Sequence, residues 1–386
     1  MRELGKWTRV KRATPEPCSV FPINQWPREI LTEIFWNCVP KITETASWVS
    51  SSYYGPLSLC RVCSSWYALA LATPKLWTTV VIIIGDRCVD LSDVTHVTNV
   101  WLQRSGALPL TLRLDHNLHL PNKAKPAVVD AILSIFYSYS SRWQNVALNL
   151  HEHRSMSFPR LDTPLLQSFH LGGYWSKRFH FPFSPSPRLK GISWPFALDA
   201  RTNPQILWSQ ISYLHFSYRM SFFAASETIR LCPRLEEFSV MLTSHHSMSM
   251  ATDGTLPLNP LVANSHLRIL KINSFEGCVS FMDSFTLPAL EEFDYTFKGG
   301  DIEYTVGLAV QRAFLNLLTR SNCKLKRLGL SGCIISSSAA LECFAHDSLD
   351  TIQALRIAFY PKLIDDVLVS LLSPYLPLHI AYCYPS

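Results

Sequence analysis

The residues whose types and spacing suit chemistry are few and scattered. Cys60 and Cys63 have the Cys-x-x-Cys spacing of thiolate metal ligands, and His151 and His153 would lie on one face of a strand. A structural zinc site needs further ligands at a suitable spacing, and none follows Cys63 nearby. We therefore expect no metal site, and we interpret the histidines, including the pair at 245–246, as solvent-facing.

Paired carboxylates, which can serve as general acid and base, occur in two Leu-Glu-Glu-Phe tetrads at 235–238 and 290–293. Neighbouring strand residues point to opposite faces, so we predict that these carboxylates do not work as pairs. The chain also lacks a Gly-x-Ser-x-Gly elbow, a Gly-x-x-x-x-Gly-Lys phosphate loop and a Gly-x-Gly-x-x-Gly fingerprint. We expect a binding protein without catalytic residues or cofactor, with an enzyme on an unrecognised fold as the distant alternative.

Composition narrows the class of protein further. The chain has 386 residues, of which 48% are hydrophobic and 17% charged, and this excludes a disordered chain. The net charge is +6, and much of it lies in the first twelve residues, so a nucleic-acid partner is not expected. No apolar run approaches the length that spans a bilayer, so no membrane association is expected. The eleven cysteines are irregularly spaced and follow no signal peptide, which favours an intracellular location, cytoplasmic or nuclear.

The elements that must position a binding site begin with two amphipathic segments. Residues 1–21 are basic and rich in proline, and we predict a disordered tail. Apolar residues at i, i+4 and i+8 predict a helix over 27–40, with Pro27 at its first position. A polar loop at 41–55 separates it from a second predicted helix over 57–72, which ends before Pro74. The apolar face of this second helix is predicted to hold Leu59, Val62, Cys63, Trp66, Leu69 and Ala70.

Beyond residue 78 the periodicity becomes that of short strands. After a buried strand at 78–84, an apolar-x-x-apolar-x-apolar unit starts at residues 143, 166, 189, 211, 235, 267, 290, 325 and 352. These starts step by 23, 23, 22, 24, 32, 23, 35 and 27 residues, close to the period of about 20–29 residues in leucine-rich repeats. Each unit predicts one strand of a shared core. Helical or irregular return segments are predicted at Phe222–Leu231, Gln311–Thr319 and Ala339–Phe344. The aromatic clusters at 174–180 and 194–196 are left open between a recognition surface and loop packing.

The N-terminal segments resemble a known module. Ile23 to Phe35 is similar to the opening of an F-box, Leu-Pro-x-Glu-Ile-Leu-x-Glu-Ile-Phe, with Trp26 in place of the usual leucine. Residues 56–77, with Val-Cys-x-x-Trp and Ala-x-x-Thr-Pro-x-Leu-Trp, resemble its second half. This form of the motif is similar to the F-box proteins abundant in mushroom-forming (basidiomycete) fungi, which commonly carry degenerate leucine-rich repeats. The fold expected is therefore α/β, with an F-box-like all-α module over 22–78 followed by an irregular leucine-rich-repeat solenoid over 79–386.

The resemblance implies a substrate-receptor subunit of an SCF-type E3 ubiquitin ligase. Such a chain binds a Skp-family adaptor, and through it a cullin-RING ligase, while its repeats hold an unknown target protein. The alternative is a repeat scaffold in which the F-box-like helices only cap the end. The residues expected to contact the adaptor are apolar side chains of the two helices: Trp26, Pro27, Ile30, Leu31, Ile34, Leu57, Val62, Cys63 and Trp66. Some of these are expected to belong to the module's own core instead.

Overall fold

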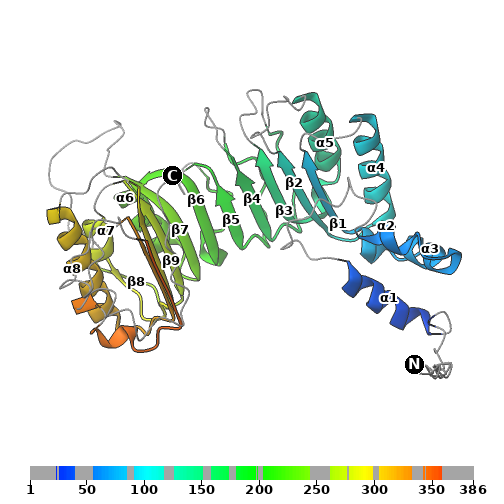
Figure 1. The fold of residues 1–386 in the computed structure, drawn as a ribbon. Helices are drawn as coiled ribbons and strands as arrows, with labels where there is room; N and C mark the ends of the chain where they lie inside the picture. The colour runs from blue at the N-terminus through cyan, green and yellow to red at the C-terminus, as the bar shows by residue number, and fades with distance from the viewer. Residues whose placement is uncertain are drawn as a thin grey trace, which may run out of the picture.

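A computed structural model describes residues 23, 26–39, 55–84, 91–116, 126–150, 158–173, 180–196, 198, 203–243, 261–275, 278–298, 304–332, 342–343 and 345–358. It is a mixed α/β molecule built on one large parallel sheet, which confirms the predicted class (Figure 1). The predicted tail, most of the loop at 41–55, both histidine pairs and most of the cluster at 174–180 lie outside these residues.

The main sheet contains eleven strands, and each described neighbour pair is parallel. They run in chain order as β1 (Thr79–Ile84), β2 (Leu110–His116), β3 (Trp143–Leu150), β4 (Ser168–Gly172), β5 (Gly191–Trp194), β6 (Tyr213–Ser221), β7 (Glu237–Thr243), β9 (Ile269–Ser274), β11 (Glu292–Phe297), β12 (Arg327–Ser331) and β13 (Ala354–Ala358). The short strands β8 (Val262–Ala263) and β10 (Phe285–Thr286) form a separate parallel pair.

The register of the sheet repeats the spacing seen in the sequence. From β3 to β13, the residues paired at the first position are Asn145, Ser168, Gly191, Tyr213, Glu237, Ile269, Glu292, Arg327 and Ala354. They step by 23, 23, 22, 24, 32, 23, 35 and 27 residues, as the nine predicted units do. Every predicted unit therefore supplies one strand. The sequence also predicted β1, but it missed β2, although Leu110, Leu112 and Leu114 alternate with polar residues there.

The larger helices that return the chain are gathered at the two ends of the sheet (Figure 1). They are α4 (Leu91–Arg104), α5 (Pro126–Ser138), α6 (Phe222–Leu231), α7 (Val279–Asp283) and α8 (Tyr304–Ser321), with 3-10 turns η3 (Ser140–Arg142), η4 (Trp208–Gln210) and η5 (Asp347–Leu349). The predicted return helix at 222–231 matches α6, and the one at 311–319 lies inside the longer α8. Among the described residues, none of the helices is long and apolar enough to cross a bilayer.

Aromatic side chains fill the core where such helices are lacking. Between β3 and β6 the described connections contain turns, and Phe169, Phe181, Phe183 and Trp194 are buried against one another. The rings of Phe169 and Phe183 lie 4.6 Å apart, and those of Phe181 and Trp194 lie 5.2 Å apart. Burial of Trp194 and Phe196 resolves the open question about 194–196, because both side chains pack inside.

The helical module comprises α1 (Arg28–Cys38), α2 (Pro56–Leu59), α3 (Ser64–Leu71) and the 3-10 turn η2 (Pro74–Trp77). The predicted single helix over 57–72 is wrong, because the chain leaves the helix between α2 and α3. The N–H groups of Arg61 and Val62 bond carbonyls three residues back, and Cys63 is extended. Val62 therefore points away from the face that the helical spacing had assigned to it.

Candidate interaction surfaces

The interior of the module is built from a few apolar residues of α1, α2 and α3. Phe35 is fully buried, and its ring lies 4.7 Å from the ring of Trp66. Leu59 and Ala70 are buried in the same cluster. Leu31 is also buried. These helices are too short to hold their shape alone, so this packing is what fixes their arrangement.

The nine residues predicted to contact an adaptor divide by exposure. Trp26, Ile30 and Val62 are exposed large apolar side chains, at 38%, 49% and 58%, and Pro27 is exposed with them. Ile34, Leu57, Cys63 and Trp66 are half-buried, and Leu31 is buried at 6%. Leu31 thus belongs to the interior of the module, whereas the exposed residues are available to a partner.

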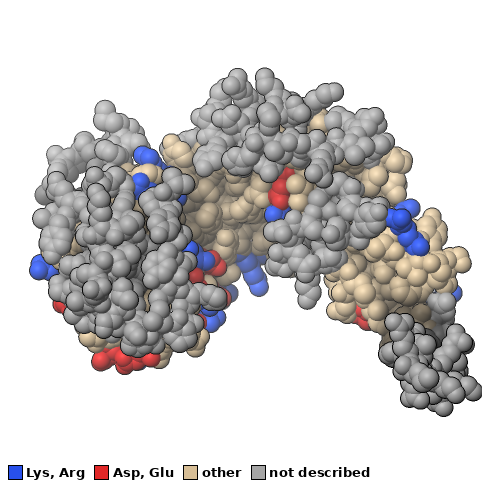
Figure 2. Space-filling view, in the orientation of Figure 1, with Lys and Arg blue, Asp and Glu red and all other residues tan. Residues whose placement is uncertain are grey.

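Two exposed apolar residues of the module were missed by the sequence. Tyr67 on α3 is 48% exposed, and Ile23 just before α1 is 37% exposed. Tyr67 was missed because the single predicted helix turned it away from the apolar face. We call Ile23, Trp26, Ile30, Val62 and Tyr67 together the module surface. In Figure 2 the module is mainly covered by residues without charge. Exposed apolar side chains that lie together in one patch are typical of partner sites, whereas single ones are normal on a protein surface.

The two cysteines of the Cys-x-x-Cys pair have different environments. Burial raises the pKa of the Cys60 thiol, and Arg104 opposes this shift. Hydrogen bonds from Ser65 and the backbone of Trp66 lower the pKa of the half-buried Cys63 thiol. In the described part of the chain, no three His, Cys, Asp or Glu side chains are grouped so as to hold a metal ion.

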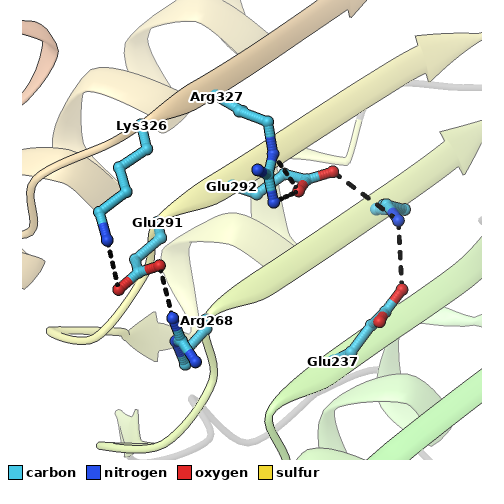
Figure 3. A network of polar contacts seen from close by, with 7 residues as sticks. Glu237, Arg268, Glu291, Glu292, Lys326 and Arg327 are labelled. Atoms are coloured by element: carbon cyan, nitrogen blue, oxygen red, sulfur yellow. Dashed lines mark hydrogen bonds and ion pairs between the residues drawn. The ribbon is translucent and has the colours of Figure 1, made fainter. Parts of the chain in front are cut away.

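Ion pairs cross the strands β7, β9, β11 and β12 on one face of the sheet (Figure 3). Lys271 lies 3.1 Å from Glu237 and 3.7 Å from Glu292, and Arg327 Nε donates to Glu292 over 2.6 Å. A parallel chain links Arg268 to Glu291 over 2.8 Å and Glu291 to Lys326 over 3.1 Å. We call these seven residues the ion-pair ladder.

The second glutamate of each Leu-Glu-Glu-Phe tetrad, Glu237 or Glu292, belongs to this ladder, and so does Glu291. The prediction that the two carboxylates of a tetrad point to opposite faces is wrong, because Glu236 and Glu237 line the same cavity. The physical reason is that Glu236 precedes β7, which begins at Glu237, so strand alternation does not apply to it. Glu291 precedes β11 in the same way. The carboxylates of Glu237, Glu291 and Glu292 pair with cations on neighbouring strands or just before them.

A cavity of about 220 Å³ opens at the start of these strands. Its walls combine carboxylates, guanidinium groups and hydroxyl groups from five successive strands and the turns before them. Neighbouring Arg268 and Lys326 lower the pKa of the Glu291 carboxyl, which therefore remains ionised. The cavity thus offers charge of both signs, and its lining is Ser212, Tyr213, Glu236, Glu237, Arg268, Ile269, Glu291 and Arg327.

Farther toward the module, the same face carries a network of hydrogen bonds. Arg113 Nε donates to Asp115 over 2.8 Å, and Asn149 Nδ2 donates to the other Asp115 oxygen over 2.6 Å. His170 Nε2 donates in turn to Asn149 Oδ1 over 2.9 Å. A Cβ on Gly172 would lie 2.3 Å from that same oxygen, so only glycine leaves room for the network. This region presents an amide and an imidazole beside the ion pair of Arg113 with Asp115, whose closest nitrogen and oxygen lie 2.7 Å apart.

The face does not assemble a nucleophile with its base. In the register of the sheet, Ser193 of β5 lies beside His170 of β4 and His215 of β6. Its hydroxyl is buried without a hydrogen bond. Activation of a serine requires a hydrogen bond to a base. Among the described residues of this face, Ser193 therefore lacks the hydrogen bond that would activate it as a nucleophile.

A scan of the chain against models of known protein families finds no match, and a search of curated proteins finds no similar sequence.

Proposed function

We propose that this chain is the substrate-receptor subunit of an SCF-type ubiquitin ligase, an F-box protein with degenerate leucine-rich repeats. Its module would bind a Skp-family adaptor and so a cullin-RING ligase, and its sheet would hold the target. The chain would form and break no bonds itself, because proximity to the ligase raises the effective concentration of a target lysine. An intracellular location goes with this function.

The observation that carries the proposal is the module surface. Trp26, Ile30 and Val62 were predicted from the F-box resemblance to contact an adaptor, and all three are exposed. Full burial of an exposed apolar side chain is favourable by roughly 1.5–3 kcal/mol, and a partner would recover the share of this that corresponds to the fraction still exposed. The repeat architecture is supported by parallel strands that follow chain order at the spacing of the sequence units.

The target surface that we propose is the polar face of the sheet. We use this name for the face that carries the ion-pair ladder and the hydrogen-bond network of Arg113, Asp115, Asn149 and His170. The ion-pair ladder and the cavity beside it provide charges held in fixed positions by neighbouring strands. Preorganised polar groups of this kind provide specificity more than affinity. The chemistry of this face fits a protein segment that carries both acidic and basic side chains.

Co-expression with a Skp-family adaptor, followed by pull-down and size-exclusion chromatography, tests the module surface. The test variant is Ile30→Asp with Val62→Asp, because both side chains are about half exposed or more. The control is Leu207→Asp, which places the same charge on an apolar residue that is 46% exposed elsewhere.

We expect a stoichiometric complex with the wild type and the control, and its loss in the double variant. Circular dichroism checks that all three proteins are folded. A folded wild type that binds no adaptor, or a double variant that binds as the wild type does, would overturn the proposal.

The second candidate function is a repeat scaffold capped by the module. The buried residues of the module and of the sheet form one continuous cluster, as a cap requires. A pure cap predicts that the Ile30 and Val62 substitutions change no interaction with an adaptor, so the same experiment separates the two functions.

A further inference from the structure

The turn η2 is the point at which the module meets the sheet. Lys75 on this turn lies 3.3 Å from Glu33, and its ammonium group lies 4.7 Å from the centre of the Trp36 ring. Both partners belong to α1, and the next residue, Leu76, is fully buried. One side of η2 therefore holds α1.

Trp77, the last residue of η2, holds two further helices. Its side chain is fully buried, and the indole N–H donates to the Ala70 carbonyl in α3 over 2.9 Å. The ring meets the ring of Trp101 edge-on at 5.1 Å, and the guanidinium of Arg104 lies 4.6 Å from it. Trp101 and Arg104 belong to α4, which packs on the sheet. One indole thus joins the module to the sheet.

The connection from this indole to the sheet contains no linker. η2 ends at Trp77, and β1 begins at Thr79. The carbonyl of Thr78, the one residue between them, already accepts the N–H of Thr111 in β2 over 2.9 Å. Domains that move relative to each other are normally joined by exposed, flexible segments with few contacts across the boundary. In this chain the module and the sheet are instead joined directly, and hydrogen bonds and ring contacts cross the boundary.

We propose that Trp77 is a positioning residue, which fixes the module surface in one orientation relative to the polar face of the sheet. The functional meaning of this orientation rests on the proposed function, because a ligase receptor must present its target at a set place relative to the adaptor. The rigidity itself does not depend on the adaptor and is testable without it.

The experiment measures the distance between the module and the sheet by pulsed electron paramagnetic resonance on the full chain. Spin labels are attached to p-acetylphenylalanine at Asn37 on α1 and at Arg234 before β7, both exposed. This chemistry leaves the eleven cysteines unlabelled. The variants are Trp77→Ala and the milder Trp77→Phe, which keeps a ring and removes the indole N–H.

Trp143→Ala is the matched control. Trp143 is also fully buried, and its indole N–H donates to the Phe136 carbonyl seven residues back, over 3.0 Å. Its partners lie in α5 and the sheet, away from the module. This substitution therefore removes an equivalent buried indole and leaves the contacts between the module and the sheet unchanged.

We expect a narrow distance distribution in the wild type and in Trp143→Ala, and a broadened, shifted distribution in Trp77→Ala. If Trp77→Ala does not fold, Trp77→Phe is the test variant, with a smaller broadening. A distribution in the folded Trp77 variant as narrow as that of the wild type would overturn the proposal, and so would equal broadening in the control. Adaptor affinity, measured separately, reports on the proposed function alone.

Discussion

At the scale of single residues, two histidines of the polar face lie in environments that favour the neutral imidazole. Desolvation lowers the pKa of His170 to about 4. Electrostatic interactions with His215 and Arg113 act in the same direction, and Asp115 opposes them. The imidazole is therefore neutral at pH 7, with its Nε2 proton held by Asn149. Desolvation also lowers the pKa of His215. Both imidazoles therefore favour their neutral, hydrogen-bonding form.

The lowered pKa of His170 predicts a loss of stability in acid. An unfolded histidine binds its proton near pH 6.5, whereas the folded one does so near pH 4. Between these values the unfolded chain binds more protons, so the free energy of unfolding falls as the pH falls. We expect a loss of up to about 3 kcal/mol from this residue. Urea unfolding at pH 7, 5.5 and 4.5 measures it.

The variant His170→Gln keeps an N–H donor for Asn149 and removes the titration. Its unfolding free energy should depend less on pH than that of the wild type, with a remaining dependence from His215. The exposed His180 provides the control, since His180→Gln leaves the network untouched. Equal pH dependence in the wild type and in His170→Gln would contradict the assignment.

Glycine acts at the same scale in the ion-paired part of the face. Gly329 lies on β12 between Asp294 of β11 and Arg356 of β13. A Cβ there would lie 2.9 Å from the Asp294 carboxyl carbon, so the missing side chain lets Asp294 reach across β12 and pair with Arg356. The sequence alone does not reveal this role, because it depends on the register of three strands.

At the scale of elements, the sheet is covered in two different ways. Helices α4, α5, α6, α7 and α8 cover its two ends (Figure 1). Buried aromatic side chains fill the middle. Phe183 is central to this aromatic layer, because its ring contacts those of Trp143, Phe169 and Phe181. Between β3 and β6, where the described connections contain turns, these large rings fill the space.

Truncation of Phe183 tests how much this aromatic layer contributes to the free energy of unfolding. Phe183→Ala removes a side chain that is 3% exposed, and we expect it to reduce the free energy of unfolding by about 3–5 kcal/mol. Phe223→Ala is the control, because that ring is 51% exposed on α6, and we expect a change within about 0.5 kcal/mol. Guanidinium unfolding followed by circular dichroism measures both. Similar losses from the two substitutions would show that the rings do not carry the middle of the sheet.

The elements also show what the sequence can predict. Each of the nine predicted units supplies one strand, in the predicted order and spacing, because each strand must place alternate side chains in a shared core. The strand β2 was not predicted. The break between α2 and α3 was not predicted, because Leu59, Val62 and Trp66 keep helical spacing across the turn. The two exposed residues that were missed, Ile23 and Tyr67, follow from that error and from the short turn before α1.

At the scale of the whole molecule, each strand of the main sheet pairs only with its neighbours in the chain order. Stability in such an array is close to a sum of units and of the interfaces between adjacent units. A local change therefore acts on its neighbours before it acts on the far end. The continuous core also runs through the predicted boundary at residue 78 without a gap.

This arrangement predicts that damage stays local. Leu112→Ala removes a fully buried side chain from β2, which should increase amide hydrogen exchange in β1, β2 and β3. Exchange in β11, β12 and β13 should remain as in the wild type. Hydrogen-exchange mass spectrometry under native conditions measures both regions. Equal increases at both ends of the sheet would show instead that the chain unfolds as one unit.

Because the strands are paired at a regular spacing, the number of strands between two sites sets the distance between these sites along the sheet. Adjacent strands lie about 4.8 Å apart, so the path along the sheet from β1 to β13 is about 48 Å. A partner bound at the hydrogen-bond network of β2, β3 and β4 is held close to the module, and one bound at the ion-pair ladder several strand spacings farther away. Insertion or loss of one repeat between them would change this reach by a single strand spacing while leaving both surfaces intact.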